Sequence, residues 1–313
     1  MNSIVIALGG NALQQKGDAS AAAQERVASE TAAQIIPLLQ SGYKVVIVHG
    51  NGPQVGNIVL HEEAINTPDV PSLPLDSSVA MSQGLIGYWL QNALQNELTK
   101  NGLTVPVVTL LSQTVVGSDD PAFLEPTKPI GPFYDTEAQA RIAAETRHFI
   151  VKEDAGRGWR RVVPSPKPLA ILEQDVINAL ARAGVLVIAA GGGGVPVIKT
   201  DHGYEGIEAV IDKDFSAAVL AGRLDADVLL ILTSVEAAMI NFGTPQQIAL
   251  HDITVDAIKQ HVAAGHFAPG SMLPKVLAAV QFVEGKVGRR AVISSLSSAT
   301  AAVAGTTGTV IHQ

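Results

Sequence analysis

Three lysines stand in settings that suit the binding of phosphate. Lys128 lies between two prolines, Lys213 lies between two aspartates, and Lys275 lies in the first turn of an expected helix. A cation in a first turn opposes the helix dipole unless an anion is near, so Lys275 indicates a bound anion. Lysines that converge can drive phosphoryl transfer by positioning and electrostatics alone. The alternative for Lys213 is a surface charge pair with Asp212 or Asp214, which would contribute little.

Glycine-rich loops provide a second kind of anion site. Glycine lets backbone N–H groups approach a ligand closely, and open α/β sheets bind ligands at the carboxyl ends of their strands. One such loop is explained equally well as a tight turn, but three together favour a shared anion site. The loops are residues 9–11 (Gly-Gly-Asn), 50–54 (Gly-Asn-Gly-Pro-Gln) and 191–194 (four glycines), and each follows an expected strand.

Familiar motifs of other phosphate-binding and metal-binding proteins are absent from the sequence. There is no Walker A segment, no dinucleotide fingerprint and no protein-kinase catalytic motif. The histidines lack the spacing of a zinc site, and His49, beside Gly50, is not expected to act as a base. The chain has no cysteine, which excludes disulfides, thiolate zinc sites and cysteine nucleophiles. Phosphate chemistry in this chain therefore requires another scaffold.

Composition limits the class of protein. The chain has 313 residues, of which 47% are hydrophobic and 16% are charged, and its formal net charge is −8. This length suits one large α/β domain with an insertion. The acidic balance disfavours binding to nucleic acid or to an anionic membrane. Since no apolar run reaches the ~20 residues of a membrane helix and no signal peptide is expected, a cytoplasmic location is expected.

Short β-branched runs alternate with alanine-rich stretches along the chain. This pattern is typical of a largely parallel sheet that is covered by helices on both faces. Ser20, Thr254 and Ser271 are predicted to cap three of the helices. The expected strands are residues 4–8, 44–48, 105–111, 185–190, 228–232 and 291–293, and the expected helices are residues 20–40, 77–100, 174–183, 213–224, 255–263 and 273–285.

Residues 118–168 break this alternation. The segment is rich in proline and carries a dense run of charge that includes Arg157, Arg160 and Arg161. Unstructured connections of this length are uncommon in compact domains, so we predict an inserted subdomain. The three arginines are interpreted as a solvated face, and a role in closing a lid is the alternative.

Seven blocks of the sequence resemble carbamate kinases, in the same order and over nearly the whole chain. The resemblance implies a single amino-acid-kinase domain over residues 1–313, a three-layer α/β/α sandwich around an eight-stranded, mainly parallel sheet, with residues 118–168 as a protruding subdomain. The blocks are residues 8–12 (LGGNA), 49–56 (HGNGPQVG), 126–131 (PTKPIG), 152–159 (KEDAGRGW), 190–196 (AGGGGVP), 209–214 (AVIDKD) and 265–275 (GHFAPGSMLPK).

The resemblance also implies an activity. An ATP:carbamate phosphotransferase moves a phosphoryl group reversibly between ATP and carbamate, giving ADP and carbamoyl phosphate, with Mg²⁺ carried by the nucleotide. A homodimer is implied, with the formation of ATP from carbamoyl phosphate in the catabolism of arginine, agmatine or purines. Carbamate is already an anionic nucleophile, so no general base is needed. Two alternatives stay open: a kinase for another small acid, such as an acylated amino acid, and a catalytically silent nucleotide sensor.

Individual residues receive roles from the same resemblance. Lys128 is implied to reach the transferring phosphoryl group, and Lys213 and Lys275 to hold the ATP phosphates, with Asp212 orienting them. The N-terminal half is implied to bind carbamate and the C-terminal half, from about residue 185 to 313, the nucleotide. The implied carbamate and phosphoryl ligands are Gly9, Gly10, Asn11, Gly50, Asn51, Gly52, Gly192 and Gly193, and the implied nucleotide contacts are Thr233, Ser234, Asn241, Phe242, Gly243, Met272 and Lys275.

One position departs from the wider family. Ala7 stands two residues before the first loop glycine, where other amino-acid kinases usually carry a lysine. Carbamate kinases also lack that lysine, so the resemblance implies that Lys128 supplies the missing charge from elsewhere in the chain.

Overall fold

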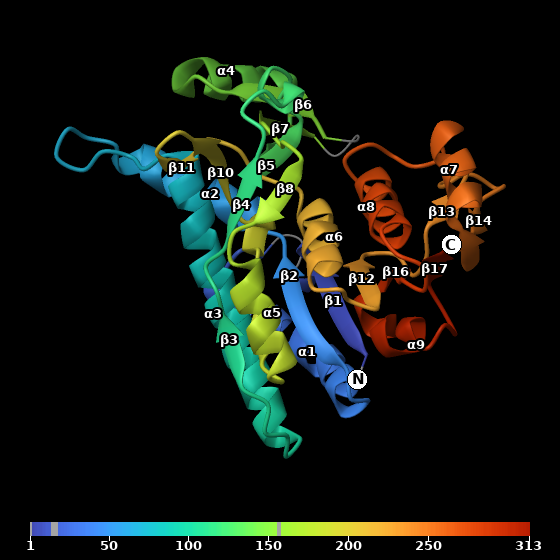
Figure 1. Cartoon of the computed structure of the whole chain (residues 1–313). Helices are drawn as coiled ribbons and strands as arrows, with labels where there is room; N and C mark the ends of the chain where they lie inside the picture. Colours follow the sequence, from blue (N-terminus) through green and yellow to red (C-terminus); the bar gives the residue numbers. More distant parts are fainter. Residues whose placement is uncertain (1, 14–17, 155–157) are drawn as a thin grey trace.

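The computed structural model describes residues 2–13, 18–154 and 158–313. Its centre is an eight-stranded sheet in the order β15–β17–β16–β12–β1–β2–β9–β3 (Figure 1). In this sheet β16 and β17 pair antiparallel, and the other neighbours pair parallel. The strands are β1 (Ser3–Leu8), β2 (Lys44–His49), β3 (Val107–Thr109), β9 (Leu186–Ile188), β12 (Val228–Thr233), β15 (Asp252–Thr254), β16 (Arg290–Ser295) and β17 (Thr309–His312).

Helices cover both faces of this sheet, which confirms the predicted three-layer sandwich. Successive side chains of a strand point to opposite faces, so Val5 and Ala7 of β1 pack into one core and Ile4 and Ile6 into the other. The core that contains Val5 is closed by α5 (Gln174–Arg182), α6 (Lys213–Arg223), α7 (Val255–Ala263) and α8 (Met272–Glu284). The core that contains Ile4 is closed by α1 (Ala21–Gln40), α3 (Leu75–Lys100) and α9 (Ala299–Val303).

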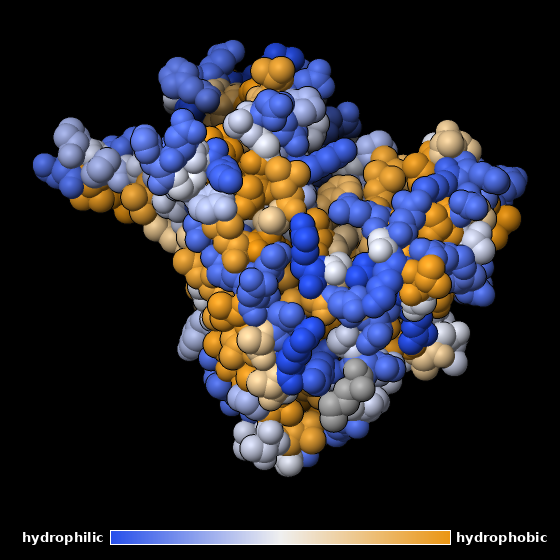
Figure 2. Space-filling model, in the orientation of Figure 1, coloured by the Kyte–Doolittle hydropathy of each residue, from blue (hydrophilic) through white to orange (hydrophobic). Residues whose placement is uncertain are grey.

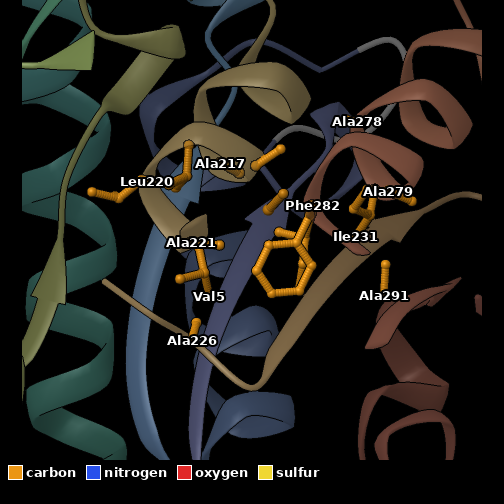
Figure 3. Packing of buried hydrophobic residues seen from close by; sticks show 14 of the residues in the cluster. Val5, Ala217, Leu220, Ala221, Ala226, Ile231, Ala278, Ala279, Phe282 and Ala291 are labelled. Carbon is orange, nitrogen blue, oxygen red and sulfur yellow. The ribbon is translucent and has the colours of Figure 1, made fainter. Parts of the chain in front are cut away.

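Helices α6 and α8 pack against each other over the sheet. Phe282 of α8 is 1% exposed and lies close to Val5, among the buried alanines of both helices (Figure 3). Small side chains such as Ala217 and Ala279 let the two helices approach closely. This packing matters for the site, because the N-termini of α6 and α8 carry Lys213 and Lys275.

The predicted helices and strands are confirmed with small shifts at their ends. Ser20 and Thr254 cap α1 and α7, since each hydroxyl accepts a hydrogen bond from the backbone N–H three residues later, at 3.3 Å. The prediction that Ser271 caps α8 is wrong: its side chain accepts no capping hydrogen bond from the described residues. A backbone turn starts this helix instead, in which the N–H of Leu273 donates to the carbonyl of Ala268 at 3.1 Å.

Helix α2 (Gly52–Ile65) was not predicted from the sequence, in which residues 50–54 are interpreted as a loop. It starts inside that loop, with Asn51 at the capping position and Pro53 in the first turn, where proline is tolerated. Its first turn therefore belongs to the glycine-rich segment, so α2 begins at the site that this segment was predicted to form.

Two smaller sheets stand beside the carboxyl ends of the central strands (Figure 1). Within residues 118–168, a three-stranded sheet and α4 (Glu137–Arg147) form the projection at the top of Figure 1. Most of the surface at α4 is hydrophilic in Figure 2, although Ile142 is exposed, and this helix buries Ala140. The strands are β5 (Lys128–Tyr134), β6 (Ile150–Glu153) and β7 (Trp159–Val163) in the projection, β4 (Gln113–Val116), β8 (Pro168–Ile171), β10 (Val195–Thr200) and β11 (Gly203–Gly206) in the four-stranded sheet, and β13 (Met239–Ile240) with β14 (Ile248–Ala249) in a separate hairpin.

In the described ranges, none of the helices combines the length and the apolar character that crossing a membrane requires.

Candidate active site

A cavity of about 270 Å³ opens at the carboxyl ends of four adjacent parallel strands, β12, β1, β2 and β9. The three glycine loops that the sequence predicted to share an anion site meet here, because the strands that precede them are neighbours in the sheet. The predicted residues that line this cavity are Gly9, Gly10, Gly50, Asn51, Gly52, Lys128, Gly192, Asp212, Lys213, Thr233, Ser234 and Lys275.

Three lysines enter this cavity from three different elements. Lys128 is the first residue of β5, Lys213 is the first residue of α6, and Lys275 lies in the first turn of α8. Two aspartates link them: Lys128 Nζ lies 2.6 Å from Asp212 Oδ2, and Lys275 Nζ lies 3.0 Å from Asp214 Oδ2. Lys213 also pairs with Asp214. Three ammonium groups against two carboxylates leave a net positive charge for an incoming anion.

Asp212 begins α6 as its capping residue. Its Oδ1 accepts a hydrogen bond from the backbone N–H of Asp214 at 2.9 Å, and its other carboxylate oxygen receives Lys128. Burial alone would raise the pKa of Asp212, but the ammonium of Lys128, with those of Lys213 and Lys275, holds it well below its usual range. Asp212 is therefore ionised and fixes the start of the helix that carries Lys213.

Asp214 is a site residue that the sequence did not reveal. The alternative of a surface charge pair with Lys213 is wrong, because Asp214 is 2% exposed and lies between Lys213 and Lys275. Burial raises the pKa of Asp214, but the charges of these two lysines outweigh it, so the net pKa is lowered. The available signal was its place in the first turn of a helix, where a carboxylate is stabilised by the dipole.

The two lysines that share Asp214 differ in their own titration. Burial lowers the pKa of Lys213, and Asp214 offsets this effect only in part. Burial also lowers the pKa of Lys275, but the charges of Asp214 and Asp212 outweigh this effect, so the net pKa of Lys275 is raised. The anion that the position of Lys275 in a first turn indicated is thus, in the structure itself, Asp214. Lys275 remains a cation under all ordinary conditions.

Residues of the third glycine loop, 191–194, have different structural roles. Gly192 lines the cavity and has a φ of +65°, and a Cβ there would overlap the side chain of Asn51. Gly193 is not among the described residues that line the cavity; its carbonyl accepts hydrogen bonds from Thr114 at 2.8 Å and Ser216 at 2.7 Å. Gly193 therefore anchors the loop to the core.

Asparagines flank the first two glycine loops. Asn51 is 3% exposed, and its Nδ2 donates to Ser82 Oγ of α3 at 2.8 Å, which fixes the loop after β2. Asn11 lies in a short 3₁₀ turn, Gly10–Ala12, and its side chain lies outside the described part of the structure.

His49 lies beneath the second loop and is 1% exposed. Burial lowers its pKa to about 4; the nearby charge of Lys213 acts in the same direction, and the contact with Gly50 opposes it. The ring is therefore neutral near pH 7. Its Nδ1 lies 2.8 Å from the carbonyl oxygen of Gly50, and because a carbonyl only accepts, Nδ1 carries the proton.

A second cavity, of about 550 Å³, adjoins the first. Thr233, Ser234, Ser271 and Lys275 line both cavities. Its volume lies within the ~300–1,000 Å³ of typical small-molecule sites. Of the predicted nucleotide contacts, Asn241, Phe242 and Met272 also line it, whereas Gly243 is not among the described lining residues. Val235 lines it as well, and three further lining residues, Met239, His266 and Phe267, received no role from the sequence.

The arginines of the projection are not a solvated face, in so far as the structure describes them. Arg160 is 9% exposed and lines the first cavity, and Arg161 pairs with Glu63 of α2 at 2.6 Å. Arg157 lies outside the described residues.

This geometry suits a ligand with an apolar group in the second cavity and phosphates in the first. Lys213 and Lys275, at two helix N-termini, favour phosphate oxygens. A second, smaller anion would fit at the glycine loops, with Lys128 available to neutralise charge between the two.

The model of the amino acid kinase family matches residues 2–295 of the chain. The chain is 50% identical to carbamate kinase 1 of Enterococcus faecium over 94% of each chain, and 50% identical to the carbamate kinase of Pyrococcus furiosus over 98% of each. Among solved structures, the carbamate kinase of Giardia lamblia bound to citric acid has a TM-score of 0.94 and 42% identity, covering 99% of this chain and 98% of that chain. The same enzyme bound to AMP-PNP has a TM-score of 0.89 and 43% identity over the same shares.

Proposed function

This chain belongs to the amino acid kinase family, and within it to the carbamate kinases, and we propose that its two adjoining cavities hold the two reactants. It transfers a phosphoryl group reversibly between ATP and carbamate, giving ADP and carbamoyl phosphate. The observation that carries the proposal is the meeting of Lys128, Lys213 and Lys275 with the glycine loops around one cavity.

The nucleoside of ATP would occupy the larger cavity, against the side chains of Phe242 and Met272. Its phosphates would extend past Ser271 to Lys275 and Lys213, since Ser271 and Lys275 line both cavities. The positive ends of α6 and α8 favour phosphate at this place. That a relative from Giardia lamblia binds AMP-PNP supports this side of the proposal.

Carbamate would bind at the loops after β1 and β2, through Gly9, Gly10 and Asn11 and through residues 50–52. Backbone N–H groups there suit a small carboxylate-like anion. Because the carbamate oxygen already carries negative charge, in-line attack on the phosphoryl group requires no general base, and the work of the protein is positioning and charge stabilisation.

Lys128 would neutralise charge on the phosphoryl group as it passes between an oxygen of carbamate and an oxygen of ADP. Lys213 and Lys275 would hold the nucleotide phosphates both before and after the transfer. Asp212 and Asp214 would orient the three ammonium groups. The ion pair from Lys128 to Asp212 and the pairs from Lys213 and Lys275 to Asp214 support this assignment.

We propose that Mg²⁺ arrives with the nucleotide. In the described part of the chain, no three carboxylate or imidazole side chains lie close enough to hold a metal ion. Mg²⁺ needs no such cage, because it usually keeps several waters and binds through substrate phosphates with one or two carboxylates. Among the described residues, Asp212 and Asp214 are the carboxylates that line the cavity, and they are the side chains that would contribute oxygen ligands. When bound, the ion neutralises charge on the phosphate oxygens.

The two halves of the chain would bind different substrates. We propose that the N-terminal half binds carbamate, that residues from about 185 to 313 bind the nucleotide, and that residues 118–168 form a unit that covers the site. We also propose that the chain works in the cytoplasm and forms ATP from carbamoyl phosphate in the catabolism of arginine or related nitrogen compounds.

A homodimer is proposed as well. Exposed apolar side chains follow one face of α3 at helical spacing: Met81, Leu85 and Tyr88, with Tyr88 62% exposed, and Leu111 lies beside them. Contiguous exposed apolar residues of this kind mark interaction surfaces. Light scattering during gel filtration would give twice the mass of one chain, and the mass of one chain would contradict the proposal.

The activity is tested by supplying the purified chain with ADP and carbamoyl phosphate and measuring ATP with luciferase. ATP formation is expected, and formation at a much higher rate from an acylated amino-acid phosphate would identify another acceptor. Nucleotide binding without turnover would instead indicate a sensor.

A further inference from the structure

The strand that carries Lys128 is irregular three residues further on. Strand β5 pairs with β7 in regular antiparallel register up to Ile130, and the register then shifts before Tyr134. Gly131 lies in this bulge with a φ of +72°, a backbone conformation that favours glycine. The bulge takes the carbonyl of Gly131 out of the ladder.

Arg160 of β7 binds that carbonyl from one side. Its Nε and Nη2 both donate to Gly131 O, at 3.0 and 2.8 Å. Its Nη1 pairs with Asp154 Oδ2 at 3.2 Å, and its guanidinium lies 4.9 Å from the centre of the Phe133 ring. The side chain is only 11% exposed. These contacts fix the plane of the guanidinium and, with it, the position of Gly131.

Helix α2 contacts Gly131 as well. The backbone of Gly56 packs directly on it, and a Cβ at Gly56 would overlap the backbone N and Cα of Gly131. Helix α2 starts at Gly52, within the loop that lines the cavity. The contact between Gly56 and Gly131 therefore connects the loop after β2 to the strand that carries Lys128.

We propose that Arg160 is a positioning residue for Lys128: it presses the bulge of β5 onto α2 and so sets where the Lys128 ammonium enters the cavity. The inference rests on the proposed role of Lys128 in the transfer. The lysine side chain is flexible, so the position of its backbone in β5 determines where its ammonium group lies. A misplacement of about 1 Å can lower a rate by about 10²-fold.

Arg160 also lines the cavity, so a direct contact with the phosphoryl group is the competing explanation. The geometry favours positioning, because three of its N–H groups are directed at Gly131 and Asp154. The two explanations differ in a measurable way. A residue that acts only through Lys128 has no further effect once Lys128 is removed, whereas an independent ligand of the phosphoryl group does.

The experiment measures kcat and the KM for ADP in ATP formation for K128A, R160K, R160Q and the double variant R160K/K128A. We expect R160K and R160Q to lower kcat by about 10²-fold with the KM for ADP unchanged, and the double variant to equal K128A. A double variant that is slower than K128A by the same factor would overturn the inference, as would an R160K that keeps wild-type kcat. If K128A itself is fully active, the proposed role of Lys128 fails and the inference with it; if K128A is impaired and both Arg160 variants are normal, the inference alone fails.

A second variant guards against misfolding of the Arg160 variants. G56A would displace Gly131 from α2 without changing Arg160, and it is expected to lower kcat with unchanged KM for ADP. G222A in α6 is the matched control: it also adds a methyl group within a helix, where the nearest atom would lie 3.8 Å away, and is expected to keep wild-type kcat. The dissociation constant for ADP, measured by calorimetry, shows that each variant is folded. A G56A variant with wild-type kcat would overturn the inference.

Discussion

Lys213 and Lys275 reach the cavity by a different route from Lys128. The first two project from helices that are packed together through alanines on the central sheet, share one buried aspartate, and have side chains that are 9% and 15% exposed. Lys128 projects from a small sheet that stands off the core, has a side chain that is 26% exposed, and forms one ion pair with the described residues. The two lysines that we propose to hold the nucleotide phosphates, the proposed phosphate clamp, therefore belong to the core, whereas the lysine proposed to act on the transferring phosphoryl group is carried by a separate element. Stability and catalysis should therefore respond differently to changes on the two sides.

The largest effect is expected at Asp214. In D214N two buried ammonium groups lose their charged partner, and breaking a buried ion pair typically costs about 3–5 kcal/mol. We expect the free energy of unfolding to fall by about this amount, and ADP binding to weaken. Urea unfolding and calorimetry with ADP measure both.

D225N is the matched control, because Asp225 is also paired with Lys286 and Arg289 but its side chain is 54% exposed. Exposed pairs contribute about 0–1 kcal/mol. If D214N and D225N lost the same free energy of unfolding, the ion pairs of Asp214 would contribute no more than an exposed surface network. The difference between the two groups of lysines would then not hold.

Replacing Lys128 should lower the rate of the reaction and leave the free energy of unfolding nearly unchanged. K128A is expected to lower kcat by about 10²–10³-fold, as for the loss of one transition-state donor, because the charge on the moving phosphoryl group loses its partner. The luciferase assay measures the rate, and urea unfolding the stability.

K199A controls for the loss of a lysine, since Lys199 is exposed on β10. Near-normal turnover in K128A would reject the role assigned to Lys128. A large loss of stability in the same variant would instead remove the distinction between the two sides.

His49 extends the comparison to the loop after β2. Its pKa of about 4 in the folded chain lies below the ordinary value of 6.5, so the unfolded chain binds more protons between these two values. Its contribution to stability is complete above pH 6.5 and is lost as the pH falls toward 4, by about 3 kcal/mol at most. H49N, which keeps a donor for Gly50 O, should flatten this part of the pH profile of unfolding.

H202N is the control, because His202 lies in an exposed turn. If the wild type and H49N lose the same free energy between pH 6.5 and 4, other groups account for the acid sensitivity and His49 is not the group that senses pH under this loop.

The smallest effect is expected at the nucleoside end of the larger cavity. Phe242 is 65% exposed, and a stacked aromatic contributes about 0.5–1.5 kcal/mol beyond its burial. F242A should therefore raise the KM for ADP by up to about tenfold and leave kcat unchanged. Y204A, at an exposed tyrosine of β11, is the control, and an unchanged KM in F242A would remove Phe242 from the nucleoside site.

Local patterns in the sequence were sufficient for most of the fold. The expected strand at residues 44–48 is β2, and the expected helix at residues 213–224 is α6, because periodic burial and caps are properties of neighbouring residues. The failures have local causes too. Glycine and proline at residues 50–54 masked the start of α2, and a backbone turn replaced the predicted cap at Ser271.

The chain by itself determined which residues are charged, where glycine permits close approach, and which helices carry a lysine at their first turn. Only the tertiary structure decided the partners of those lysines. Lys128 meets Asp212 across 84 residues, and Lys275 meets Asp214 across 61. No periodicity or spacing encodes such pairs, because the pairing depends on which strands lie side by side and on which helices pack together. The burial that turns Asp214 from an ordinary surface carboxylate into the shared partner of two ammonium groups exists only once those layers have closed.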